Sequence, residues 1–166
     1  MGGNVTATKL AIALALLTAQ GHAATTQCGP DEKVIFSCST GAKLVSVCAT
    51  GKMSPTVGSL SYRFGPPGQP EITYPPAASW RGVTFSGTWM FSGGGGAWLA
   101  FHRDAFRYIV YTAIGRGWGE KTGLAVEQNG KLLANFPCHG KPMSELGPDF
   151  FSSAGIANDD KDFELP

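Results

Sequence analysis

The 166-residue chain is predicted to fold as an all-β domain, a small antiparallel barrel or sandwich of about eight strands. Short runs rich in β-branched and aromatic residues recur along it, separated by Gly, Pro, Asn and Ser. Between residues 34 and 138 no apolar pattern repeats with the 3.6-residue period of a helix. Asn129 and Gly130 stand between two such runs, and Asn-Gly is the strongest short-range signal for a β-hairpin. These features together favour a sandwich or a barrel.

Residues 1–23 have the features of a secretory signal peptide. Lys9 precedes an apolar run over residues 10–17, and the segment ends at Ala23 with the small residues that a signal peptidase reads. The run is too short for a comfortable transmembrane helix, and no other apolar run approaches that length. We therefore expect a periplasmic or secreted protein without a membrane span.

A single β domain is expected over residues 24–140. Residues 34–38 and 44–48 are two β-type runs, and the turn residues between them predict a hairpin. Residues 60–64 alternate apolar and polar side chains, as a half-buried strand does. The strands expected after this point cover residues 71–74, 83–85, 89–91, 98–101, 106–113, 123–128 and 131–136.

The C-terminal tail, residues 141–166, is expected to be poorly structured. Strand patterning stops at Pro142, and Ser, Gly and Asp become frequent after it. The aromatic residues that could anchor this tail are Phe150, Phe151 and Phe163.

The net charge of +1 hides an asymmetry between the body of the chain and its end. Residues 24–144 hold eleven basic and six acidic residues, whereas residues 145–166 hold six acidic residues and Lys161. The acidic end could fold back onto the body or stay solvated, and an imbalance of this size favours solvation. Nucleic acid is not expected as a partner, because no dense basic cluster is present and the chain is exported.

All four cysteines, Cys28, Cys38, Cys48 and Cys138, lie after the signal peptide. An even number of cysteines in an exported chain predicts two disulfides, for which three pairings are possible. The hairpin of the first two strands brings Cys28 near Cys48 and leaves Cys38 for Cys138, which is the pairing we expect. A metal site is not expected, because the ten-residue spacings do not match a zinc site.

Four consecutive glycines, Gly93, Gly94, Gly95 and Gly96, separate two aromatic segments. Glycine lets a ligand or another backbone come close, so the run is either a loop built to be approached or a bend within a sheet. It lacks the Gly-Lys-Ser/Thr ending of a phosphate-binding loop, and no helix follows it. We favour a loop that a partner approaches.

No constellation of residues predicts an enzyme or a cofactor. His102 and Asp104 are interpreted as part of a charged turn, because side chains two residues apart at a strand end do not face each other as a triad with Ser92 would require. The carboxylates are scattered, and the cysteines are expected to be oxidised and so unavailable as nucleophiles. Catalytic residues, cofactors and metals are therefore not expected.

The four tryptophans and four tyrosines are many large rings for a chain of this length. At least half of them are expected in the core, and the others are candidate anchors for a protein or a sugar. Trp118 stands between Gly117 and Gly119 and beside Arg116. It is the tryptophan that we most expect at the surface.

The order of these features resembles the periplasmic inhibitors of c-type lysozyme, as well as other exported bacterial β proteins. The resemblance rests on a signal peptide, a first strand that ends in Phe-Ser-Cys at Cys38, a Ser-Gly-rich loop before an aromatic strand, and a last strand that ends at Cys138. It covers roughly residues 34–138 by pattern rather than by continuous identity.

The family inserts a loop of a small β-barrel into the lysozyme cleft, and a second, Lys-containing loop assists. The resemblance therefore implies that residues 93–98 are the inserted loop and that Arg116 or Lys121 comes from the second loop. Gly94 stands where the family has its serine, and Ser92 lies two residues before that position.

We expect an exported, non-enzymatic binding protein, an inhibitor or immunity-type protein that blocks an envelope-directed enzyme such as a peptidoglycan hydrolase. The alternative is a cell-wall or glycan-binding module that uses exposed tryptophans. The residues expected to contact the partner are Ser92, Gly93, Gly94, Gly95, Gly96, Trp98, Arg116, Trp118 and Lys121.

Overall fold

The computed structural model describes residues 1–2, 25–76 and 79–166. The expected signal peptide falls almost entirely in residues 3–24, outside the described part of the chain. Among the described residues, no helix has the length and apolar character needed to cross a membrane.

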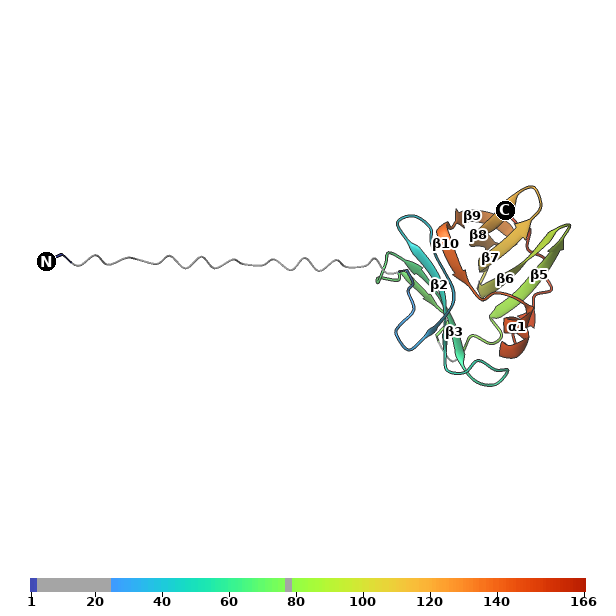
Figure 1. Cartoon of the computed structure of the whole chain (residues 1–166). Coiled ribbons are helices and arrows are strands. Elements are labelled where there is room, and N and C mark those ends of the chain that lie inside the picture. Colours follow the sequence, from blue (N-terminus) through green and yellow to red (C-terminus); the bar gives the residue numbers. More distant parts are fainter. Residues whose placement is uncertain (3–24, 77–78) are drawn as a thin grey trace.

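Two β-sheets that face each other form the domain (Figure 1). The first contains β1 (Lys33–Ser39), β2 (Leu44–Thr50), β3 (Ser59–Gly65), β4 (Ile72–Tyr74) and β10 (His139–Ser144), in the order β10-β1-β2-β3-β4. The second contains β5 (Thr84–Phe91), β6 (Gly94–Arg103), β7 (Phe106–Gly115), β8 (Gly119–Gln128), β9 (Lys131–Pro137) and β11 (Ala157–Asn158), in the order β11-β5-β6-β7-β8-β9. Neighbouring strands are antiparallel, except for the parallel pair of β11 and β5.

The all-β prediction is confirmed, with a sandwich as the architecture. The described residues contain eleven strands, where about eight are expected from the sequence. The two strands expected at residues 83–85 and 89–91 are one strand, β5, which begins at Thr84. Gly87 continues the strand between them, opposite Trp98 of β6, and its missing side chain makes room for the ring of that tryptophan.

Both expected disulfides are confirmed. Cys28 is bonded to Cys48 of β2, with 5.4 Å between their Cα atoms. Cys38 of β1 is bonded to Cys138 between β9 and β10, with 5.6 Å between Cα atoms. The second bond joins the two sheets where the chain passes from one to the other. Both bonds agree with maturation in an oxidising compartment.

The core lies between the sheets. Tyr62 of the five-stranded sheet packs against Phe101 and Tyr108 of the six-stranded sheet, with ring centroids 5.8 and 5.3 Å apart. Trp80, in the connection between the sheets, is fully buried and donates its indole N–H to the carbonyl oxygen of Gly58 at 3.1 Å. The expectation that at least half of the tryptophans and tyrosines are buried is confirmed for Tyr62, Trp80, Trp98 and Tyr111.

The expectation of a poorly structured tail over residues 141–166 is wrong. β10 pairs with β1, helix α1 (Pro148–Ala154) buries Phe151, and β11 pairs with β5. Phe163 is 3% exposed and packs on the outer face of the six-stranded sheet. The acidic composition does not predict this folding. A few apolar residues that pack against the sheets hold the segment, and they follow no regular apolar pattern in the sequence.

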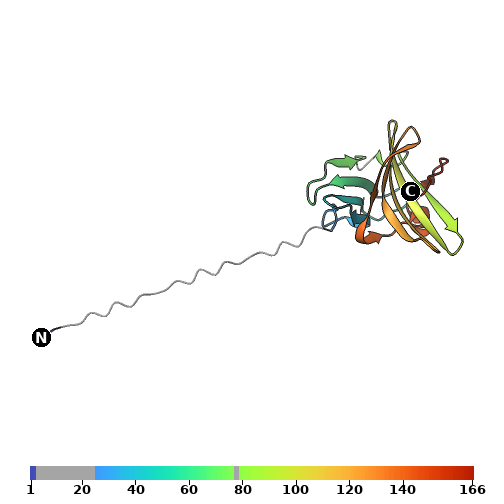
Figure 2. The ribbon, with the colours of Figure 1, turned by 90° about the horizontal axis from the view of Figure 1, so that it is seen from above.

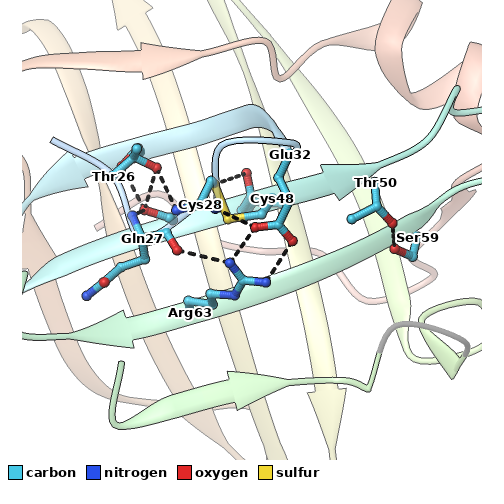
Figure 3. Close-up of polar contacts among 12 residues, drawn as sticks. Thr26, Gln27, Cys28, Glu32, Cys48, Thr50, Ser59 and Arg63 are labelled. Carbon is cyan, nitrogen blue, oxygen red and sulfur yellow. Dashed lines mark hydrogen bonds and ion pairs between the residues drawn. A yellow bond between two sulfur atoms is a disulfide. The ribbon is translucent and has the colours of Figure 1, made fainter. Parts of the chain in front are cut away.

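Residues 25–32 cross the outer face of the five-stranded sheet (Figure 3). A disulfide fixes Cys28 there, and the Arg63 guanidinium donates two hydrogen bonds to Glu32, at 2.5 and 2.7 Å. Burial opposes ionisation of Glu32, but the hydrogen bonds from Arg63 and from the Gly29 N–H, together with the charge of Arg63, outweigh it and lower the pKa of the carboxyl. This N-terminal segment is therefore fastened both covalently and by charge.

Candidate binding site at two hairpin tips

The glycine run lies inside a strand, contrary to the expectation of a loop. Ser92 and Gly93 alone form the turn of the β5–β6 hairpin, and β6 begins at Gly94. Gly95 and Gly96 are paired with β5 on one side and with β7 on the other. The run is therefore mostly a stretch of central strand, and only its first residue lies where a partner could meet a turn.

The glycines of this sheet leave room for aromatic rings that lie against it. A Cβ on Gly96 would stand 2.8 Å from the ring of Trp89, and a Cβ on Gly115 would stand 2.3 Å from the ring of Trp118. Real Cβ atoms do not approach other atoms so closely, so the rings could not keep these positions over alanine. A Cβ on Gly94 would overlap the backbone carbonyl of Ile114, so the close approach that the glycines permit is made by backbone and side chains of this chain.

The turns of the β5–β6 and β7–β8 hairpins lie at the same end of the six-stranded sheet, and Figure 2 shows β5 reaching far from the five-stranded sheet. Phe91, before the first turn, packs edge-on against Trp118 in the second, with centroids 5.6 Å apart and ring planes at 82°. Gly93 lies on the side chain of Arg116, because a Cβ there would stand 3.1 Å from Arg116 Cβ. The paired tips, as we call this region, are residues 90–93 and 114–118.

The paired tips expose apolar and cationic side chains together. Met90, Ile114 and Trp118 are 90%, 59% and 40% exposed. Arg116 is exposed and makes no ion pair with any residue that the structure describes. Beside the tips, Lys121 Nζ lies 5.7 Å from the centroid of the Trp118 ring, within range of a cation–π interaction. Aromatic residues and arginine are enriched among the residues that dominate interfaces, so the paired tips are the candidate binding surface.

Comparisons with protein-family models, curated proteins and solved structures find no match for this chain. The resemblance to lysozyme inhibitors therefore stays a prediction. Function has to be argued from the geometry and chemistry of the site, since a fold alone does not determine it.

The structure brings together only part of the expected binding set. At or beside the paired tips lie Ser92, Gly93, Arg116, Trp118 and Lys121. The strand behind the tips contains Gly94, Gly95 and Gly96. Trp98 is 3% exposed because Phe163 covers it, with ring centroids 6.0 Å apart. The expectation of a surface position for Trp118 is confirmed.

Three tip residues are absent from the expected set, namely Met90, Phe91 and Ile114. Met90 and Phe91 stand in the run expected as a strand over residues 89–91, and Ile114 directly follows the run expected over residues 106–113. The Ser-Gly dipeptide at Ser92 was the available signal, because a two-residue hairpin turn makes the residues before it the end of a strand. A two-residue turn at Ser92 and Gly93 places Met90 and Phe91 at a hairpin end, and Ile114 lies beside the second turn, between β7 and β8.

His102 faces Asp159 of the C-terminal segment rather than Asp104. Its Nε2 lies 2.9 Å from Asp159 Oδ2, and Arg107 donates to the same oxygen at 3.0 Å. A turn at residues 104–105 joins β6 to β7, as the interpretation of a charged turn predicts. This charged group attaches the end of the chain to the six-stranded sheet.

Proposed function

We propose that this protein is an exported, non-enzymatic inhibitor or immunity-type protein that inserts its paired tips into the cleft of a peptidoglycan hydrolase. The observation that carries the proposal is the contact between Phe91 and Trp118 at the ends of two hairpins, with the unpaired Arg116 beside them. A protruding apolar end with a cation suits a cleft better than a flat surface. The two disulfides support export to the periplasm or the exterior, where such enzymes act.

Both faces of the paired tips carry apolar side chains. Successive residues of a strand point to opposite faces, so Met90 and Phe91 lie on different sides of β5. Ile114 adds a second exposed apolar side chain at the end of β7. Fully burying one such side chain stabilises a complex by roughly 1.5–3 kcal/mol. A two-sided apolar tip gains most when it is enclosed, as it would be in a cleft.

The charge of the tips indicates the chemistry of that cleft. The guanidinium of Arg116 has the planar geometry that matches a carboxylate. Most glycoside hydrolases carry two carboxylates beside the bond that they cleave. A peptidoglycan hydrolase that cuts the glycan strand therefore presents the acidic, elongated cleft that the tips would fill.

The proposal is tested by inhibition of peptidoglycan lysis. We expect the protein to slow a glycan-cleaving enzyme, such as a c-type lysozyme or a glucosaminidase, and to leave a peptide-cleaving amidase unaffected. Trp118→Ala should raise the inhibition constant about 30-fold, as expected for a central aromatic anchor, and Arg116→Gln about tenfold. Leu133→Ala is the matched control, because Leu133 is 56% exposed but lies on β9.

Absence of inhibition of every glycan-cleaving enzyme by the folded protein would contradict the proposal. The alternative, a glycan-binding module, is supported by Trp118, which lies against Gly115 and is 40% exposed. Sedimentation with purified peptidoglycan in the absence of any enzyme distinguishes the two. Retention that Trp118→Ala abolishes would favour the module.

A further inference from the structure

The outer face of the six-stranded sheet carries a row of aromatic rings, and Phe163 lies in the middle of it. Ring centroids of Phe163 lie 5.6 Å from Trp89, 6.0 Å from Trp98 and 5.8 Å from Tyr111. Trp89 in turn stacks on Phe91, at 6.0 Å. A side chain from the end of the chain thus fills a gap in a surface that three strands supply.

The segment that brings Phe163 there, residues 160–166, is called the strap. The last backbone-to-backbone hydrogen bond of the described chain runs from Asp159 N–H to Ser86 O at 2.9 Å, before the strap begins. The strap itself is held through side chains of the sheet. These donate to strap carbonyl oxygens, from Trp89 Nε1 to Phe163 O at 3.0 Å, from Arg107 to Lys161 O at 3.3 Å, and from Lys121 to Pro166 O at 2.6 Å.

A surface that makes contacts of this kind is suited to binding an extended peptide. The sheet contacts the aromatic side chain of the strap, three of its backbone oxygens, and the carboxylate of Asp159 immediately before it. The acids of the strap, Asp160, Asp162 and Glu164, flank Phe163 and are exposed, while residues 24–144 carry a basic surplus. None of these contacts is a ladder of the sheet, so the strap can leave while both sheets stay closed.

We propose that this outer face is a second binding site, for an extended segment of a partner protein in which an aromatic residue is flanked by acidic residues. The strap is its resident occupant, and a partner segment of the same chemistry takes its place. The proposal concerns a different surface from the paired tips and does not depend on their function. Lys121 and the row from Trp89 to Phe91 connect the two surfaces.

The full chain with Phe163→Ala tests the proposal, because loss of the aromatic anchor should free the strap. The probe is a labelled synthetic peptide with the sequence of residues 157–166, ANDDKDFELP. Its binding, followed by fluorescence anisotropy, should be at least tenfold tighter to the variant than to the wild-type chain, whose own strap competes at high effective concentration. A peptide with Ala in place of its Phe should bind at least tenfold more weakly.

A second measurement on the wild-type chain keeps the proposal open to refutation if the variant does not fold. The indole N–H of Trp89 is bonded to the strap, whereas that of Trp80 is bonded to Gly58 in the core. Hydrogen exchange should be at least tenfold faster at Trp89 than at Trp80, since only strap opening is needed.

Three outcomes would overturn the proposal. The first is equal exchange at Trp89 and Trp80, which would mean that the strap opens only when the protein unfolds. The second is failure of the folded Phe163→Ala chain to bind the peptide. The third is binding of a chitin oligosaccharide, but not of the peptide, to that chain, which would make the exposed face a glycan platform.

Discussion

The two outer faces of the sandwich are each covered by one end of the described chain, but they are covered in different ways. Residues 25–32 lie on the polar face of the five-stranded sheet, where a disulfide at Cys28 and the Glu32–Arg63 pair fasten them. The strap lies on the aromatic face of the six-stranded sheet, where the burial of Phe163 and side-chain hydrogen bonds hold it. One covering is permanent, and the other is built from interactions that can be exchanged.

This difference suggests how the molecule divides stability and binding between its faces. A covalent link removes conformational freedom from the unfolded chain and stabilises the whole domain. Aromatic and side-chain contacts stabilise only while the segment is docked, so their loss exposes a surface suited to a ligand. We therefore assign the five-stranded sheet to structure and propose the six-stranded sheet, with its tips, as the binding side.

The largest effect is expected from removing the fastening of the five-stranded sheet. Replacement of both Cys28 and Cys48 by Ser removes the disulfide between them, which closes a loop between residues 20 positions apart in the sequence. The chain-entropy model predicts a loss of about 3 kcal/mol in the free energy of unfolding. Urea unfolding followed by tryptophan fluorescence measures it, and the exchange rate at the Trp89 indole, which requires only strap opening, should not change. A strap that opens more readily in this double variant would show that the two coverings are coupled.

A smaller loss in the free energy of unfolding is expected when a side chain fills the space beneath an aromatic ring on the six-stranded sheet. A Cβ on Gly87 would stand 2.3 Å from the ring of Trp98, so Gly87→Ala forces that ring outward against Phe163. Overpacking of this kind costs roughly 1–3 kcal/mol. Gly147→Ala is the matched control, because a Cβ there meets no atom within 4 Å. Equal urea midpoints for the two variants would contradict the role given to the glycines.

Local patterns in the sequence predict the all-β fold, the first hairpin and the disulfide pairing. Each depends on neighbours in the chain: the turn residues before Lys43 define the hairpin, and the hairpin brings Cys28 to Cys48. The turn at residues 104–105 and the exposure of Trp118 are local in the same sense. These features do not require knowledge of which strands meet across the molecule.

The glycine run and the tail depend on partners that are distant in the sequence. Gly96 is required because a Cβ there would meet both Trp89 of β5 and Ala113 of β7, and the strap is held because Phe163 fits among rings from three strands. Composition does not show which residues pack together. A glycine run is therefore interpreted as a loop, and an acidic segment is interpreted as disordered. The residues of the paired tips were predicted only in part, because Arg116 and Trp118 stand in a turn, whereas Met90 stands in a strand.

The smallest effect is expected at Glu32, and it depends on pH. Glu32→Gln removes the charge that the Arg63 guanidinium contacts at 2.5 Å, in a site where the Glu32 side chain is 14% exposed. Loss of a hydrogen bond to a charged group costs roughly 1.5 kcal/mol at neutral pH. The pKa of Glu32 is lower in the folded protein than in the unfolded chain, so its contribution is complete above the unfolded value and is lost as the pH falls through the folded value.

The wild-type and Glu32→Gln chains should therefore differ in urea midpoint at pH 7 and converge only as the pH falls below the folded-state pKa of Glu32, which lies below the ordinary glutamate value. A substitution in the strap provides the comparison, since Glu164→Gln changes a residue that is exposed and has no ion pair among the described residues. Its midpoint should follow that of the wild-type chain at both ends of this pH range. If Glu32→Gln did the same, the N-terminal covering would be held by its disulfide alone, and the contrast between the two faces would reduce to one covalent bond.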